Sequence, residues 1–347
     1  MANPAESGVS NRPEGDNSAW LAQVQEEVLE PALPICDPHH HLWDFEAHRY
    51  LLPDLLADLT SGHDVRSSVF IECTAMYRAT GPEELRPLGE TEFVNGAAAM
   101  SASGTYGPVR ACAGIVGFAN LSLGARVEPI LHTHLAVSGG RFRGIRHISA
   151  FDPSGAVRRS HTNPPPGLLA EARFREGFAC LGKLGLSFDA WLYHPQLGEL
   201  TALARAFPGQ PIVLNHVGGP LGIGPYAGKR AEVFPLWQKA IRELATCPNV
   251  TVKLGGLGMK IIGYDLHKRP RPPDSQELAD LWRPYMETCI EAFSPQRCMF
   301  ESNFPVDKVS GSYRVYWNAF KRLASGASKA EKAALFHDTA ARFYRLG

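Results

Sequence analysis

The sequence lacks the features of a nucleic-acid-binding or membrane protein. Its 347 residues include 35 Lys and Arg against 35 Asp and Glu, so the formal net charge is zero. Basic runs interleaved with aromatic residues are absent, and nothing in the composition would attract nucleic acid or an anionic membrane. No window approaches the roughly 18 consecutive apolar residues of a membrane span. The composition therefore favours small-molecule chemistry.

The sequence also has no C-x-x-C motif, and its first residues lack the features of a signal peptide. The seven cysteines are an odd number, are scattered along the chain and form no C-x-x-C motif, which argues against a disulfide framework and indicates a reducing compartment. The first residues, MANPAESG, have neither the basic nor the apolar region of a signal peptide. We therefore expect a cytoplasmic protein.

The chain begins with a segment of low hydrophobicity. Residues 1–19 are rich in Asn, Ser, Pro, Gly and Glu, and such a composition cannot offset its ordering entropy by burial. We expect a disordered tail there. Apolar residues then recur at helical spacing, from Trp20 and Leu21 through Val24 and Val28 to Pro31, and predict an N-terminal helix over residues 20–32.

Residues 33–347 have the organisation of one α/β domain. Eight apolar runs are mostly continuous, as in strands buried on both faces of a parallel sheet, and most gaps between them hold a helical pattern. Eight such units predict a single (β/α)8 TIM barrel. A doubly wound sheet is the alternative, but no G-x-G-x-x-G follows the first run. The runs cover residues 33–39, 69–73, 109–118, 142–148, 186–193, 211–216, 250–254 and 298–301.

Polar side chains follow these runs where a barrel builds its active site, at the C-terminal ends of the strands. The first run ends in a His-x-His pair, and alternation along a strand would project Asp37, His39 and His41 to one face and His40 to the other. Two imidazoles so spaced are a common start of a divalent metal site, or they position a water or a carbonyl without metal. The other candidates are Glu72, Arg146, Asp189, Trp191, His216, Lys253, Glu301 and Asn303.

Four motifs then occur in order, DPHHHLW at 37–43, RGIRH at 143–147, NHVGGP at 215–220 and FESNFP at 300–305. With them the chain resembles the amidohydrolase superfamily, specifically amidohydrolase family 2 and its branch of 2-pyrone-4,6-dicarboxylate lactonase, 4-sulfomuconolactone hydrolase and sugar lactonases. The resemblance extends from about residue 33 to the closing segment at 335–344. It implies a TIM-barrel, metal-dependent hydrolase in which water attacks a lactone or amide carbonyl at the barrel mouth.

The resemblance also implies roles for individual residues. His39, His41 and His216 would contact one divalent metal, zinc or manganese, or the substrate carbonyl directly, because some lactonases of this branch work without metal. Arg146 would hold a substrate carboxylate, since a guanidinium binds carboxylates in bidentate fashion.

The eighth strand departs from the family pattern. The family carries Ser-Asp-Trp-Pro there, and its Asp takes the proton of the attacking water, whereas this chain has Asn303. An amide is not a base. Three interpretations follow: Asn303 orients the water, Glu301 replaces the base, or the site no longer hydrolyses anything. Glu301 is equally interpretable as a buried structural carboxylate paired to Lys253.

The remaining candidates concern the substrate. Lys253 is a charge within an apolar strand and would point into the barrel mouth together with Glu72 and Asp189, while Trp191 could stack on a flat substrate. The long loop over residues 255–284 carries Lys268, Arg269 and Arg271, which suits an anionic substrate or, alternatively, a contact within a homo-oligomer.

These observations predict a lactonase acting on a small anionic substrate, or a hydrolase of a related cyclic ester or amide. The alternative enzyme is a metal-dependent decarboxylase or hydratase of an aromatic or unsaturated acid. The alternative from another class is a non-catalytic barrel that binds a small carboxylate.

Overall fold

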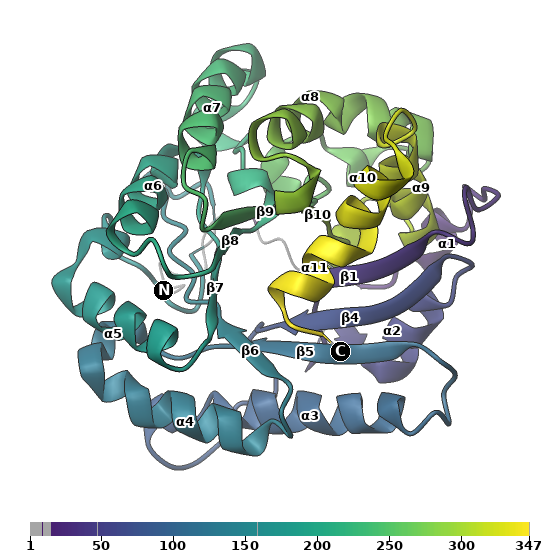
Figure 1. The fold of residues 1–347 in the computed structure, drawn as a ribbon. Coiled ribbons are helices and arrows are strands. Elements are labelled where there is room, and N and C mark those ends of the chain that lie inside the picture. Colours follow the sequence, from purple (N-terminus) through teal and green to yellow (C-terminus); the bar gives the residue numbers. More distant parts are fainter. Residues whose placement is uncertain (1–8, 10–14, 47, 158, 347) are drawn as a thin grey trace.

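A computed structural model describes residues 9, 15–46, 48–157 and 159–346, and its centre is a ring of eight parallel strands (Figure 1). Each strand pairs with the next along the chain, in the order β1-β4-β5-β6-β7-β8-β9-β10. Backbone bonds from Asn303 N–H to the His39 carbonyl (2.9 Å) and from His41 N–H to the Phe304 carbonyl (2.8 Å) join the segment after β10 to β1. The TIM barrel predicted from the sequence is confirmed.

All eight predicted strands form, with shifted boundaries. The ring consists of β1 (Pro34–His40), β4 (Asp64–Ile71), β5 (Arg110–Gly117), β6 (Phe142–Ile145), β7 (Ser187–Ala190), β8 (Ile212–Leu214), β9 (Val250–Leu254) and β10 (Cys298–Phe300). The sequence did not predict a small hairpin of β2 (Trp43–Phe45) and β3 (His48–Tyr50). These three-residue strands are too short to produce an alternation pattern.

Helices cover the outside of the ring (Figure 1). None of the helices in the described part of the chain is long and apolar enough to cross a membrane. They are α2 (Leu52–Leu59), α3 (Leu88–Ala102), α4 (Glu128–Val137), α5 (Ala172–Lys183), α6 (Leu197–Ala206), α7 (Arg230–Ala245), α8 (Ser275–Phe293), α9 (Tyr313–Leu323), α10 (Lys329–Ala333) and α11 (Thr339–Phe343).

The N-terminal segment differs from the expectation. Instead of a helix over residues 20–32, only α1 (Ser18–Leu21) forms. Side chains of α9 satisfy the backbone beyond it: Asn318 binds the Glu27 carbonyl and the Leu29 N–H, and Lys321 donates to the Leu29 carbonyl. A helix is not needed where tertiary partners take its hydrogen bonds. Most of the tail expected over residues 1–19 lies outside the described residues, but Val9 pairs with Val157.

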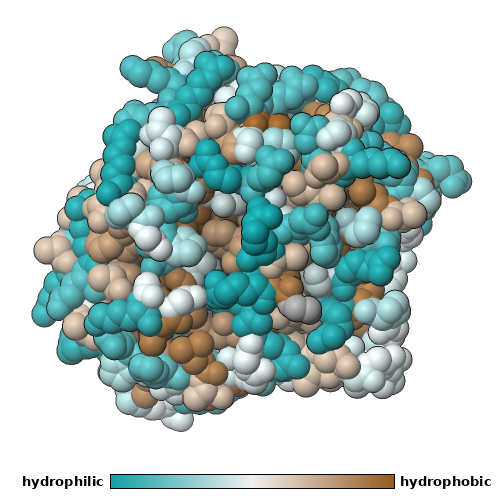
Figure 2. Space-filling view, in the orientation of Figure 1, coloured by the Kyte–Doolittle hydropathy of each residue, from teal (hydrophilic) through white to brown (hydrophobic). Residues whose placement is uncertain are grey.

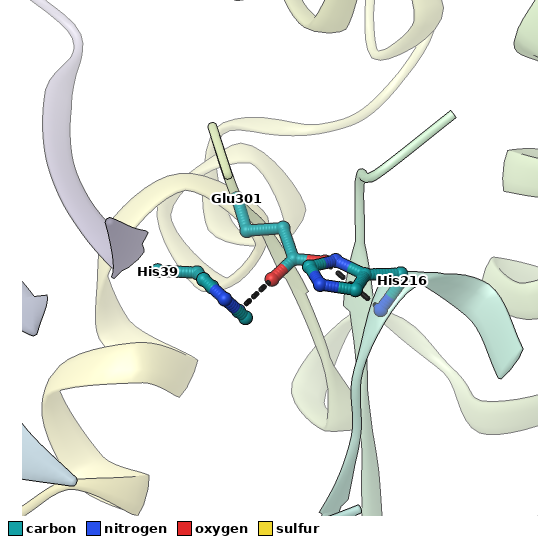
Figure 3. A group of neighbouring side chains, drawn as sticks. All are labelled: His39, His216 and Glu301. Carbon is teal, nitrogen blue, oxygen red and sulfur yellow. Dashed lines mark hydrogen bonds and ion pairs between the residues drawn. The ribbon is translucent and has the colours of Figure 1, made fainter. Parts of the chain in front are cut away.

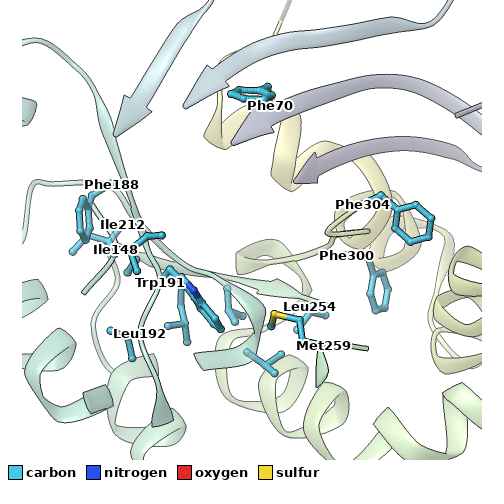
Figure 4. Packing of buried hydrophobic residues seen from close by; sticks show 14 of the residues in the cluster. Phe70, Ile148, Phe188, Trp191, Leu192, Ile212, Leu254, Met259, Phe300 and Phe304 are labelled. Atoms are coloured by element: carbon cyan, nitrogen blue, oxygen red, sulfur yellow. The ribbon is translucent and has the colours of Figure 1, made fainter. Parts of the chain in front are cut away.

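The apolar core has two parts. The larger part lies between strands and helices and includes Phe70, Phe188 and Phe300 (Figure 4). The smaller part gathers the alternate side chains of the strands, such as Val69 and Val213, around Tyr344. The C-terminal segment beyond α11 therefore lies across one end of the ring, in front in Figure 1.

Candidate active site

Glu301 lies between two histidines from distant strands (Figure 3). Its Oε1 accepts hydrogen bonds from His216 Nδ1 (2.7 Å) and His216 N–H (2.9 Å), and its Oε2 lies 2.7 Å from His39 Nδ1. The Glu301 side chain is fully buried, as is that of His39. A carboxylate that holds both Nδ1 atoms fixes the ring orientations of both imidazoles.

The histidine rings expected to converge lie side by side. The ring centroid of His39 is 5.0 Å from that of His41 and 4.5 Å from that of His216. His41 Nδ1 lies 2.8 Å from the Ile71 carbonyl, so Nδ1 carries the proton and Nε2 the lone pair. Burial is the main cause that lowers the pKa of His39 and of His41 well below 6.5, with further contributions from Lys253 for His39 and Arg146 for His41. Both rings are therefore neutral bases near pH 7.

One part of the predicted alternation is wrong. His40 points away from the site, as expected, with Nε2 2.9 Å from the Ser68 hydroxyl. Asp37, however, does not share a face with His39, because the β1 register shifts between Asp37 and His40. The Asp37 carboxylate instead accepts bonds from the Ser302 hydroxyl (2.6 Å) and the Tyr313 hydroxyl (3.0 Å). It joins β1 to α9 and does not line the site.

Lys253 and Asp189 form a buried ion pair beside His39. Lys253 Nζ lies 2.8 Å from Asp189 Oδ2 and 3.3 Å from His39 Nδ1. Asp189 Oδ2 also accepts hydrogen bonds from Asn215 Nδ2 (3.2 Å) and the Tyr344 hydroxyl (2.8 Å). Neither charged side chain has exposed surface. Both residues were expected to contact the substrate, but neither can do so while it is buried. Lys253 pairs with Asp189 and not, as was also considered, with Glu301.

Arg146 does reach the histidines, but its charge is already neutralised. Its Nε donates to Glu72 Oε1 over 2.8 Å, its Nη2 donates to the Glu72 carbonyl, and its Nη1 lies 3.4 Å from His39 Nε2. His161, from the loop after β6, lies 3.5 Å from Glu72 Oε2. Only Nη1 is therefore not bound to Glu72, which limits the bidentate grip on a substrate carboxylate that was expected for Arg146.

A second carboxylate stands behind Glu72. Glu90, on α3, accepts hydrogen bonds at Oε1 from the backbone N–H groups of Cys73 (2.9 Å) and Ala75 (2.8 Å). Burial, reinforced by the charge of Glu72, raises the pKa of Glu90 to about 8. Sequence reasoning missed this residue, because Glu90 lies in a helix and reaches the strand end only through tertiary packing.

Asn303 is held by a neighbouring carboxylate. Its Nδ2 donates to Asp307 Oδ1 over 2.8 Å, and the Gly258 N–H donates to Asp307 Oδ2 over 3.1 Å. Because a carboxylate only accepts hydrogen bonds, the NH₂ end of Asn303 must face Asp307. Asp307 is fully buried, and this burial raises its pKa. The family aspartate is thus replaced here by an Asn–Asp pair, which sequence reasoning missed.

Two glycines after β9 allow the loop to pack against the site. A Cβ at Gly255 would lie 2.4 Å from Glu301 Cγ, and a Cβ at Gly256 would lie 2.5 Å from His216 Cγ. Gly256 also has a φ of +70°, a conformation that glycine adopts without strain. The Gly-Gly pair following a predicted strand was the available signal for this close approach.

Trp191 provides an aromatic surface at the cluster. Its ring lies edge-on to His216, with centroids 4.7 Å apart, and edge-on to Tyr193 at 5.6 Å. It is one of the apolar side chains gathered near the strand ends (Figure 4) and keeps 8% of its surface exposed. The expected contact of Trp191 with a substrate ring stays a prediction.

The cations of the loop over residues 255–284 are balanced by acids. Lys268 pairs with Asp265 (3.0 Å), and Arg269 and Arg271 both pair with Glu277 (3.4 and 3.2 Å). The excess positive charge that this loop was expected to offer an anionic substrate is therefore largely compensated.

The donor set suits a divalent metal ion. His39, His216 and Glu301 each offer a ligand atom within 4.8 Å of the others, and two imidazoles with one carboxylate are a usual zinc set. His41, which the sequence placed in this set, is not part of the group. The buried Glu301 carboxylate contacts neutral imidazoles, while the nearby Lys253 is paired with Asp189, so a cation would compensate an otherwise unbalanced charge.

Comparisons with known proteins extend over the whole barrel. The family model described as Amidohydrolase matches residues 36–346. The uncharacterized protein y4mH of Sinorhizobium fredii is 35% identical over 336 residues, which are 90% of this chain and 99% of y4mH. An L-fucono-1,5-lactonase of Burkholderia multivorans is 26% identical over 324 residues, 89% of this chain and 95% of the lactonase.

A solved structure is similar over the same extent. The crystal structure of an amidohydrolase from Burkholderia multivorans, which contains bound zinc, superimposes with a TM-score of 0.69 at 26% identity. The superposition covers 90% of this chain and 99% of that one. The residues of the candidate site all lie within residues 36–346, the range that the family model matches.

Proposed function

Because this chain belongs to the amidohydrolase family, we propose that it is a hydrolase that opens a lactone ring at the cluster of His39, His216 and Glu301. The observation that carries the proposal is the buried Glu301 carboxylate, which holds two neutral imidazoles at the strand ends. The similarity to an L-fucono-1,5-lactonase over 89% of the chain supports a lactone as the substrate class.

The substrate that fits these charges is an uncharged, hydroxylated lactone, in place of the anionic one expected from the sequence. Arg146 is paired with Glu72, and Lys253 is paired with Asp189. A dianionic lactone would need cations that are free to bind it. A neutral ring could instead lie against Trp191, next to His216, and direct its hydroxyl groups to buried acceptors such as Glu72 Oε2.

The proton of the attacking water is assigned to His41 Nε2. The Ile71 carbonyl holds Nδ1–H, so Nε2 is free to accept, and the lowered pKa keeps the ring neutral before reaction. Water adds its oxygen to the lactone carbonyl and gives a proton to Nε2. The ring C–O bond then breaks, and the departing ring oxygen takes that proton back, which leaves a hydroxy acid.

A divalent metal would be held by His39, His216 and Glu301. When bound, it would supply Lewis-acid polarisation of the carbonyl and would make a nearby water more acidic. Asn303, which uses one N–H of its amide to bind Asp307, could orient that water through its carbonyl oxygen. Glu301, with contacts at both oxygens, acts in this arrangement as an anchor and not as the base.

The test compares two histidine variants and two kinds of substrate. The purified protein is assayed for ring opening of L-fucono-1,5-lactone and of a dicarboxylate lactone, with elemental analysis in parallel. We expect His41→Gln to lower kcat by about 10²- to 10⁴-fold with an unchanged metal content, and His216→Gln to lose the metal as well.

Three outcomes count against these assignments. Failure to open any lactone at any metal load contradicts the function, and a preference for the dicarboxylate contradicts the substrate assignment. Loss of metal from the His41→Gln variant contradicts its role as the base.

A further inference from the structure

A cavity lies at the opposite end of the barrel from the histidines. It has a volume of about 440 Å³ and is lined by residues at the starts of β4, β5 and β6 and by the C-terminal segment. Four of its ten lining residues are Arg66, Arg110, Arg141 and Arg143, and none is an acid. We call this cavity the basic pocket. Figure 2 shows this face, where hydrophilic side chains gather around the middle.

Three of the four arginines have no acidic partner among the described residues. Arg66 pairs with Asp64 over 2.7 Å. Arg141, however, donates to the amide oxygen of Asn95 (2.6 Å), and Arg143 donates to the carbonyl of Gly140 (2.7 Å). The Arg110 side chain makes no hydrogen bond or ion pair within the described part of the chain.

Some arginines elsewhere on the surface do pair with acids. Arg205 pairs with Glu243 and Arg283 pairs with Glu287, although the whole chain carries no net charge. In the pocket the guanidinium groups repel one another: burial first, and then the charges of Arg345 and Arg141, lower the pKa of Arg143. Arg143 Nε is also buried without a partner.

We propose that the basic pocket is a second binding site, which takes a small polyanion carrying phosphate groups. A guanidinium presents a planar fork that matches phosphate oxygens and stays charged at any physiological pH. A dianion or a more highly charged ligand would compensate the three unpaired arginines. The volume lies in the range of small-molecule sites, roughly 300–1,000 Å³, and leaves room for more than one phosphate.

The pocket is connected to the active site through the C-terminal segment. Ala341 and Leu346 form part of its wall, and Tyr344 between them donates to Asp189, the carboxylate that holds Lys253 beside His39. A ligand that fills the pocket would therefore stabilise the segment that supports the active site from below.

The test uses pyrophosphate as the probe. Calorimetric titration and thermal unfolding are carried out on the wild type, on the double variant Arg110→Gln/Arg141→Gln, and on the charge-matched control Arg126→Gln/Arg173→Gln, whose arginines are exposed on other elements. We expect saturable binding that raises the unfolding temperature. Binding should weaken by about tenfold or more in the pocket variant, the loss expected for charge-assisted hydrogen bonds, and by less than about twofold in the control.

Three results would overturn the proposal. The first is the absence of saturable binding, or a shift that sodium chloride of equal ionic strength reproduces. The second is an equal weakening in both double variants, which would indicate a general charge effect. If pyrophosphate bound an active-site metal instead, its binding would not depend on the pocket arginines. Both double variants would then bind it as tightly as the wild type. Tighter binding of citrate than of pyrophosphate would overturn the phosphate assignment.

Discussion

Asn303 donates its amide hydrogen to Asp307 over 2.8 Å, at the strand end where the family has an aspartate. Both side chains are buried, at 1% and 0% exposure, and Asp307 is anchored by the Gly258 N–H as well. The two residues therefore function as one hydrogen-bonded unit, and restoring the family aspartate alone would break that unit.

The first prediction is that Asn303→Asp destabilises the protein and lowers its activity. The change places two carboxylates at hydrogen-bond distance, so one of them must take up a proton. We expect a loss of roughly 1–3 kcal/mol, the cost of losing the amide donor and of binding that proton. The double variant Asn303→Asp/Asp307→Asn reverses donor and acceptor and should recover most of it. Urea unfolding and kcat/KM of all three proteins measure this, and a fully stable, active single variant would show that the contact is dispensable.

The second prediction concerns the buried ion pair. Lys253→Met leaves Asp189 charged and buried, and breaking such a pair costs about 3–5 kcal/mol. Lys183→Met is the matched control, because Lys183 pairs with Glu128 at 60% exposure and an exposed pair contributes only about 0–1 kcal/mol. Urea unfolding of both variants gives the comparison. Similar losses would mean that Asp189 is neutral or solvated in the native state.

The third prediction tests the close approach of the β9 loop. Gly256→Ala places a Cβ 2.5 Å from the His216 ring, whereas Gly228→Ala, at nearly the same φ (+72° against +70°), meets nothing within 4 Å. Both alanine variants therefore carry the same backbone strain, and only Gly256→Ala adds a steric clash with His216. We expect Gly256→Ala to cost about 1–3 kcal/mol more, as overpacking does, and to reduce bound metal. Equal unfolding midpoints would show that the loop moves away freely.

The fourth prediction is a pH dependence of stability from Glu90. Burial and Glu72 raise its pKa from 4.5 to about 8 in the folded protein, so the folded state binds the proton more tightly than the unfolded state. Stability from this group is present below pH 4.5 and is lost as the pH rises towards 8. Glu90→Gln should flatten this decline, whereas Glu92→Gln, an exposed residue of the same helix, should not. Urea midpoints at several pH values between 5 and 8 measure it, and parallel curves for wild type and Glu90→Gln would contradict it.

Much of the site followed from the sequence because it depends on local order. Continuous apolar runs with helices between them indicate a parallel barrel, and residues at strand ends must then meet at one face. His39, His41, His216 and Glu301 were placed together by this rule alone. The alternation rule failed at Asp37, because the register shift in β1 is set by the neighbouring strands and has no signature in the residue pattern.

Only the tertiary structure decided which charges are free. From the sequence, a cation that faces the substrate cannot be distinguished from one that is paired with an acid. In the folded protein Arg146 pairs with Glu72, and Lys253 pairs with Asp189. Tyr344 reaches Asp189 across 155 positions of the chain, a separation over which no periodicity carries information. The sequence therefore determined the barrel and the chemical types at its mouth. The packing of distant segments determined their pairing, because electrostatic compensation depends on distances of a few ångströms in space.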